Sequence, residues 1–119
     1  MGERARRPSA HPRIQPRVSP SVNTTYLAVL RIRLALPSDT LKEKRSIVKS
    51  VIARLRTRFN AAIAEVDDLD AVSFATIAAV CISNEAAHAN AQVQSIANAV
   101  EEWRLDAEVL DVSVEIIPL

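Results

Sequence analysis

Glycine is almost absent from this sequence, since only Gly2 among its 119 residues is a glycine. Phosphate-binding loops, dinucleotide-binding turns and the GxxG clamp of some RNA-binding domains all need glycine, because its backbone lets a ligand approach closely. None of these sites is therefore expected here, and we predict no cofactor.

Aromatic residues and cysteine are also scarce. The chain has only four aromatic residues, which are Tyr26, Phe59, Phe74 and Trp103. Its core must therefore be aliphatic and rich in alanine, with modest stability. Cys81 is the only cysteine, which excludes an internal disulfide and fits a reducing compartment. No apolar run approaches the roughly 20 residues that span a bilayer. The N-terminal residues also lack the apolar stretch of a signal peptide. We therefore expect a cytoplasmic protein with no membrane partner.

Residues 1–22 have the composition of a linker and not of a core. Proline recurs at positions 8, 12, 16 and 20, five arginines face a single acid, and the segment has no apolar periodicity. Such a segment buries too little surface to offset its ordering entropy. We predict a disordered basic tail over 1–22 and a single domain over 23–119.

The rest of the chain alternates between the apolar periods of strands and helices. The expected order is strand 26–36, helix 41–60, strand 61–67, strand 74–82, a helix capped by Ser83 or Asn84 and reaching Trp103, and strand 109–117. This β-α-β-β-α-β order predicts an α+β, ferredoxin-like fold: a four-stranded antiparallel sheet with both helices on one face and the first strand between the third and fourth. The prediction includes a hairpin turn at 68–70. In the last strand the inward side chains would be Leu110, Val112, Val114 and Ile116.

Charge is distributed unevenly along the chain. Residues 23–64 hold nine Lys and Arg against two acids, whereas residues 65–119 hold one Arg against eleven acids. On the first helix, one narrow arc beside the apolar face carries Lys42, Arg45, Lys49 and Arg56. A solvated helix face is the ordinary role of such residues. Two alternatives stay open, which are contacts with the phosphates of RNA and attraction to an acidic protein.

Arg31 and Arg33 point to the open face of the expected sheet, where the last strand presents Asp111 and Glu115. Cross-strand ion pairs are the favoured interpretation, and a ligand site is the alternative. The first strand offers no aromatic residue on this face for base stacking. Any RNA would therefore be bound through its phosphates, by the helices and the tail of the protein.

Catalytic and metal-binding patterns are weak. The acidic residues Glu65, Asp67, Asp68 and Asp70 favour a solvated turn over a Mg²⁺ or Ca²⁺ site, because the loop has no glycine to fold around an ion. Cys81 is expected to be an inert core residue and His88 to lie on the outer side of the second helix. We predict no catalytic residues and no metal site.

Several short motifs occur together in the order and spacing that they have in one protein family. They are Leu41-Lys42-Glu43-Lys44-Arg45, Leu55-Arg56, Arg58-Phe59-Asn60, Ala64-Glu65-Val66-Asp67, Ala75-Thr76-Ile77 and Ser83-Asn84. Together they resemble the YlxP-like bacterial proteins, the domain of unknown function 503. The resemblance implies a small cytoplasmic protein of ferredoxin-like fold without an established activity. It also suggests a ribosomal role, since such proteins are often encoded beside genes for translation initiation and ribosome maturation. Val72 stands where the family usually has a tryptophan.

These observations favour a non-enzymatic accessory factor that associates with the ribosome or RNA through the basic helix. The alternative is a homodimeric interaction module with no role in nucleic-acid binding, in which the open sheet face with Leu27 and Val29 would meet a second copy. A small-ligand or metal-dependent enzyme is the third hypothesis. We expect no sequence-specific reading of DNA.

Overall fold

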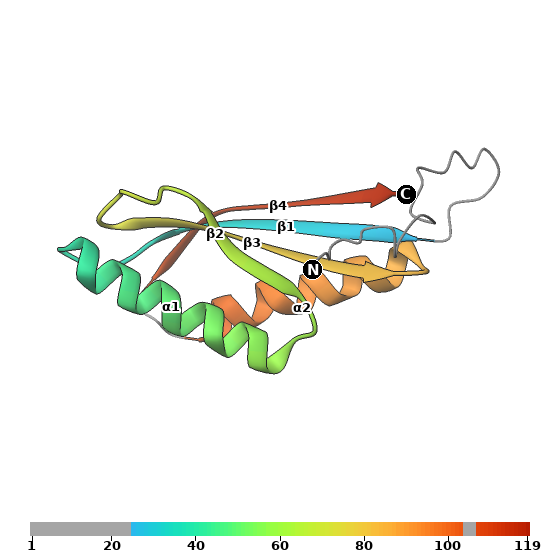
Figure 1. Cartoon of the computed structure of the whole chain (residues 1–119), viewed down its shortest axis with the longest axis horizontal. Helices are drawn as coiled ribbons and strands as arrows, with labels where there is room; N and C mark the ends of the chain where they lie inside the picture. The colour runs from blue at the N-terminus through green and yellow to red at the C-terminus, as the bar shows by residue number, and fades with distance from the viewer. Residues whose placement is uncertain (1–24, 104–106) are drawn as a thin grey trace, which may run out of the picture.

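The computed structural model describes residues 25–103 and 107–119, so the predicted tail over 1–22 lies outside the described residues. Its elements follow the order β1 (Tyr26–Ala35), α1 (Leu41–Arg58), β2 (Ala62–Asp67), β3 (Phe74–Ser83), α2 (Ala86–Glu102) and β4 (Glu108–Pro118). The four strands form one antiparallel sheet in the order β2-β3-β1-β4, and both helices lie on one side of it (Figure 1). The predicted ferredoxin-like α+β fold is confirmed.

Alternation along β1 produces the centre of the core. Ala28, Leu30, Ile32 and Leu34 are at most 2% exposed, as expected for the helix-facing side of a central strand. They pack in one cluster with residues of α1, α2, β2 and β3. On α2, Val93 and Ile96 are almost fully buried and form part of the same core.

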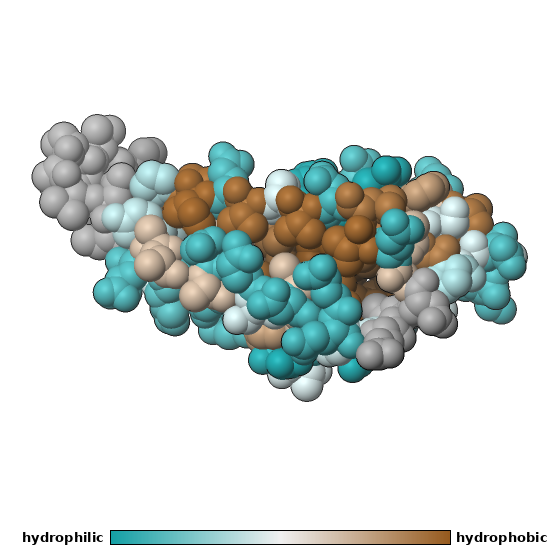
Figure 2. Space-filling model, turned by 180° about the vertical axis from the view of Figure 1, so that it is seen from behind, coloured by the Kyte–Doolittle hydropathy of each residue, from teal (hydrophilic) through white to brown (hydrophobic). Residues whose placement is uncertain are grey.

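The prediction for β4 is partly wrong. Leu110 and Val112 are each 42% exposed, whereas Val114 and Ile116 are half-buried. β4 is an edge strand, and a register shift places Arg33 opposite Asp111 but Leu34 opposite Val109, so Leu110 is the extra residue of a bulge. Figure 2 shows the result, a strip of hydrophobic surface along the upper edge of the molecule, where β4 runs in Figure 1.

One local prediction changes, and another is confirmed. The helix α2 is capped by Glu85 without a side-chain hydrogen bond, although the backbone N–H of Glu85 does donate to the Ser83 hydroxyl at 3.1 Å. The predicted turn after β2 is confirmed: the backbone N–H of Ala71 donates to the Asp68 carbonyl at 3.0 Å, and the connection to β3 then continues to residue 73. Asp68 itself has a φ of 60°. An aspartate tolerates this left-handed backbone better than most residues, and here it occupies a position that often favours glycine.

Among the residues that the structure describes, no helix is long and apolar enough to cross a membrane.

Candidate nucleic-acid interface

The helix α1 begins at a well-formed cap. The backbone N–H of Glu43 donates to the Thr40 hydroxyl at 3.1 Å, and the Glu43 carboxylate accepts from the backbone N–H of Asp39 at 3.0 Å. These contacts satisfy donors that have no partner within the helix. Arg56 and Arg58 lie in the last turn, where cations interact favourably with the helix dipole. Local chemistry therefore stabilises a helix that carries many positive charges.

Lys44 anchors α1 to the sheet, and its role was not predicted from the sequence. Its side chain is fully buried, with Nζ 2.6 Å from Oε2 of Glu65 on β2. The same ammonium donates to the backbone carbonyls of Asp68, at 2.7 Å, and Leu69, at 3.3 Å. The ammonium therefore has two carbonyl acceptors and an opposite charge beside it, which together offset the cost of burying a cation.

The sequence did contain a signal for this anchor. Lys44 precedes Val48, Val51 and Leu55 by four, seven and eleven residues, so it lies on the apolar face of the helix and not in the basic arc. The buried pair fixes how α1 lies against β2 and so positions the cations on both sides of the helix.

A groove of about 510 Å³ follows α1 where it meets β2. Three of the four residues predicted for phosphate contacts, Arg45, Lys49 and Arg56, line the groove beside apolar side chains and Glu65. The fourth, Lys42, is exposed one turn before Arg45 and is not among the lining residues. The structure thus brings most of the predicted set together along one edge of the helix.

Arg45 and Arg56 differ in whether their side chains form hydrogen bonds within the protein. A terminal nitrogen of Arg56 donates to the backbone carbonyl of Ile63 on β2 at 2.7 Å. The hydrogen bonds found among the described residues include none from the Arg45 side chain. Arg56 therefore supports the junction between α1 and β2, and Arg45 is the better candidate for an external contact.

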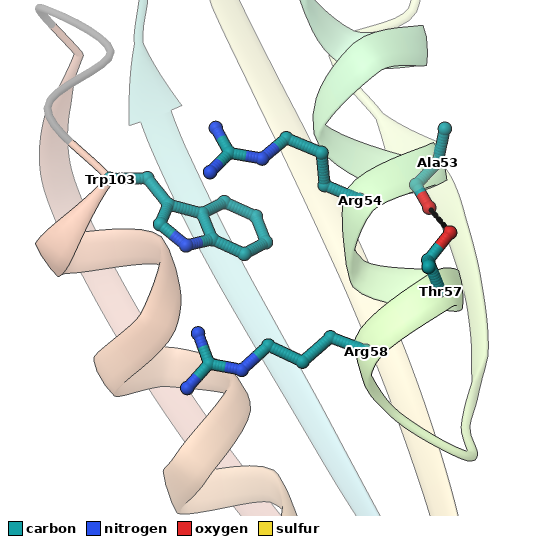
Figure 3. A pocket seen from close by; sticks show the side chains of 5 residues that line it. All are labelled: Ala53, Arg54, Thr57, Arg58 and Trp103. Atoms are coloured by element: carbon teal, nitrogen blue, oxygen red, sulfur yellow. Dashed lines mark hydrogen bonds between the residues drawn. The ribbon is translucent and has the colours of Figure 1, made fainter.

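The opposite edge of α1 carries a second basic site, which the sequence did not reveal. A pocket of about 420 Å³ is lined by Arg54, Arg58 and Trp103, with Ala53 and Thr57 (Figure 3). The guanidinium carbon of Arg54 lies 4.1 Å from the centroid of the Trp103 ring, a cation–π contact. The sequence predicts only that Trp103 lies at the end of the second helix. It does not predict the contact with Arg54, because that contact depends on how α1 and α2 pack together.

The arginines on the open face of the sheet pair with partners other than the predicted acids. Arg31 lies 4.0 Å from Asp67, and Arg33 Nε lies 3.0 Å from Asp68 Oδ2. Asp111 is opposite Arg33 in the sheet and lines the same polar cavity of about 290 Å³, whereas Glu115 is opposite Val29. The prediction considered only pairs with the last strand, whereas the observed partners are the final residue of β2, Asp67, and the first residue after it, Asp68.

Hydrogen bonds shift the titration of this cluster. The Arg33 guanidinium, and after it the Thr76 hydroxyl at 2.6 Å, holds the pKa of the Asp68 carboxyl below its ordinary value. Asp68 in turn raises the pKa of Arg33. With its carbonyl also accepting from Lys44, Asp68 links the loop to both α1 and the sheet. The acids that the sequence predicts as a solvated turn are therefore partly structural.

The remaining reactive side chains are not assembled into a centre. Cys81 is buried, and burial raises the pKa of its thiol, which keeps it in the unreactive protonated form. His88 is exposed, with Nδ1 3.1 Å from the Ser83 hydroxyl. Among the described residues, no three His, Cys, Asp or Glu side chains gather as a metal site would require.

Comparisons with known proteins identify the family of the chain. A family model described as "Protein of unknown function (DUF503)" matches residues 27–114. No curated protein matches the chain. Among solved structures, the chain is similar to a "De novo designed protein Foldit4", with 11% sequence identity, a TM-score of 0.49, and coverage of 80% of this chain and 98% of that one. The family match spans most of the chain, and the protein therefore belongs to the family of proteins of unknown function DUF503.

Proposed function

We propose that this protein is a non-enzymatic, RNA-binding accessory factor and that the solvent side of α1 is its binding surface. One observation carries the proposal. The helix exposes six cationic side chains, Lys42, Arg45, Lys49, Arg54, Arg56 and Arg58, and its only acid is Glu43. The salt bridges between described residues, Arg31–Asp67, Arg33–Asp68 and Lys44–Glu65, involve none of these six. Their charge is thus available to a polyanion.

The dimensions of the surface fit a nucleic-acid backbone. From Lys42 to Arg56 the helix rises about 21 Å, because each residue adds roughly 1.5 Å. This length allows contacts with several successive phosphates, each of which adds affinity that depends on salt. An acidic protein would find the same charges, but the aromatic pocket beside them suits a nucleic acid better, because bases stack on aromatic side chains and on guanidinium planes.

The test replaces Lys42, Arg45 and Lys49 together with Gln. Arg56 is kept because its hydrogen bond to Ile63 supports the fold. We expect RNA affinity to fall and the slope of log affinity against log salt to decrease by about 0.7–0.9 for each phosphate that is no longer bound. Thermal melting should change little, because all three side chains are exposed.

The matched control changes Arg4, Arg6 and Arg7 to Gln, which removes the same charge from residues 1–22. We expect this control to retain most of the affinity and salt slope. Equal losses in the two variants would show that the tail or the net charge contributes as much as α1, and an unchanged affinity in the α1 variant would place the binding surface elsewhere. Either result would contradict the proposal, as would the absence of RNA binding by the unmodified protein at physiological salt.

A second candidate function is self-association, favoured by the edge of the sheet and not by Leu27 and Val29 on its open face. β4 is an edge strand of eleven residues, and hydrophobic surface follows it (Figure 2). An unpaired edge of this kind is a template for another strand. If a second copy paired antiparallel about Val114, Val112 would face Ile116 of that copy and the acids Asp111 and Glu115 would not oppose each other.

Sedimentation equilibrium tests this candidate. A dimer that Val112→Lys converts to a monomer would support pairing through β4, because an edge lysine opposes strand addition. A monomer at all accessible concentrations of the unmodified protein would exclude it.

A further inference from the structure

The pocket between α1 and the end of α2 combines a flat aromatic ring with two flat cations. In the view of Figure 3 the guanidinium groups of Arg54 and Arg58 both reach from α1 toward Trp103, one on either side of the indole. Arg54 is in cation–π contact with the ring at 4.1 Å. The other described residues that line the pocket, Ala53 and Thr57, are small and leave room for a ligand to approach. The surfaces that line the pocket are therefore planar and positively charged.

Such a lining suits a ligand that is itself planar and carries a negative charge. Nucleobases stack on aromatic side chains and on guanidinium planes, and arginine binds phosphate with two parallel hydrogen bonds. Paired bases inside a duplex are already stacked on their neighbours and do not enter such a pocket. An unpaired nucleotide satisfies both conditions.

We propose that this pocket binds one unpaired nucleotide of an RNA strand, with the base stacked on the Arg54–Trp103 pair and its phosphate bound by Arg58. The inference rests on the proposed function, and it narrows the ligand from RNA in general to single-stranded segments. The exposed acids Glu101 and Glu102 immediately precede Trp103 and disfavour phosphate on the α2 side, so the strand passes on the α1 side.

The two cavities are placed for one strand to occupy both. Ala53 lines the pocket beside Trp103 and also the groove that contains Arg45 and Lys49. The two sites therefore flank the same solvent-facing side of α1. A strand whose backbone follows the groove needs only to cross this side for one base to reach Trp103.

The pocket offers little that would distinguish one base from another. Among the described residues that line it, Thr57 alone has a hydroxyl, which donates to the backbone carbonyl of Ala53 at 2.9 Å, the dashed line in Figure 3. Stacking depends on the face of the base and not on its edge, so it tolerates different sequences. Recognition is of single-stranded character and not of a sequence motif.

The single tryptophan makes this inference directly measurable, because all tryptophan fluorescence of the chain comes from Trp103. The full chain is titrated with a single-stranded adenine oligoribonucleotide and with an RNA duplex of the same length, while labelled RNA reports binding by anisotropy. We expect the single strand to quench Trp103 and to bind more tightly than the duplex. Trp103→Leu should weaken single-strand binding about 5- to 150-fold, Trp103→Phe much less, and neither should alter duplex binding.

Trp103 also packs against the core, so Trp103→Leu carries a risk to the fold. Arg54→Gln and Arg58→Gln change exposed side chains instead and should each reduce the preference for single strands, with an unchanged melting temperature. Loss of that preference in either variant supports the site even if Trp103→Leu does not fold.

The remaining outcomes show whether the nucleotide pocket alone fails or RNA binding by α1 fails with it. RNA binding with equal affinity for single strand and duplex, and with unchanged Trp103 fluorescence, overturns the nucleotide pocket but leaves RNA binding by α1 intact. Absence of all RNA binding overturns both. Equal quenching by a polyglutamate peptide of matched charge also overturns the pocket, because it would show that the site senses negative charge and not a base.

Discussion

Replacement of Lys44 by methionine should destabilise the protein more than any change of an exposed lysine. Methionine has a similar length and no charge, so it leaves the Glu65 carboxylate, only 15% exposed, without its ammonium partner. It also removes the donor to the carbonyls of Asp68 and Leu69. Removing one member of a buried ion pair costs about 3–5 kcal/mol. The total stability of a small domain is only about 5–15 kcal/mol, so the loss is a large fraction of it.

Urea unfolding followed by circular dichroism measures this loss. The matched control is Lys42→Met, two residues away and exposed, which should change the free energy of unfolding by less than about 0.5 kcal/mol. The double variant Lys44→Met/Glu65→Leu should recover at least about 1 kcal/mol relative to Lys44→Met, because no unpaired buried charge remains. If Lys44→Met were no more costly than Lys42→Met, Lys44 would not anchor α1.

Three further predictions concern the core, the loop and the tail. Ile96→Ala should cost about 2–4 kcal/mol in urea unfolding because the side chain is 1% exposed, and a loss below about 0.5 kcal/mol would mean that it does not pack in the core. The lowered pKa of Asp68 contributes stability that is present above the ordinary aspartate pKa and is lost as pH falls through the lower folded value. Asp68→Asn, which tolerates the left-handed backbone, should therefore show less loss of stability in acid than the unmodified chain, and an identical pH profile would refute this origin. Deletion of residues 1–22 should leave the melting temperature unchanged, whereas a large decrease would show that the tail docks on the domain.

The fold followed from the sequence because periodicity directly reports which side of each element is buried. Along β1 every second residue is apolar, as expected of a half-buried strand, and Leu30 and Ile32 are indeed buried in the core. The same alternation was wrong for Leu110, because a bulge interrupts the period there. Val112 does lie opposite the buried Ile32, but it is exposed, because periodicity tells the side of a strand and not whether a helix covers it. α2 contacts β1 and β3 more extensively than β4, and the edge strand is left half-exposed.

Only part of the candidate interface could be predicted from the sequence. Arg45, Lys49 and Arg56 share one arc of a single helix, so their proximity followed from helix geometry alone. The Arg54–Trp103 contact joins two helices that are distant in the chain, and no local pattern reports such a contact. The position of Lys44 on the apolar face of the helix could be predicted from the sequence. Its partner Glu65 could not, because that contact depends on how α1 lies on β2.

The most direct test of the central claim is a nitrogen–proton correlation NMR titration of the labelled full chain with a single-stranded oligoribonucleotide at physiological salt. If α1 is the binding surface, the largest shifts should fall on amides of residues 41–58 and on the indole N–H of Trp103, and they should diminish as salt is raised. Shifts confined to the open face of the sheet or to β4, or no shifts at all, would contradict the account.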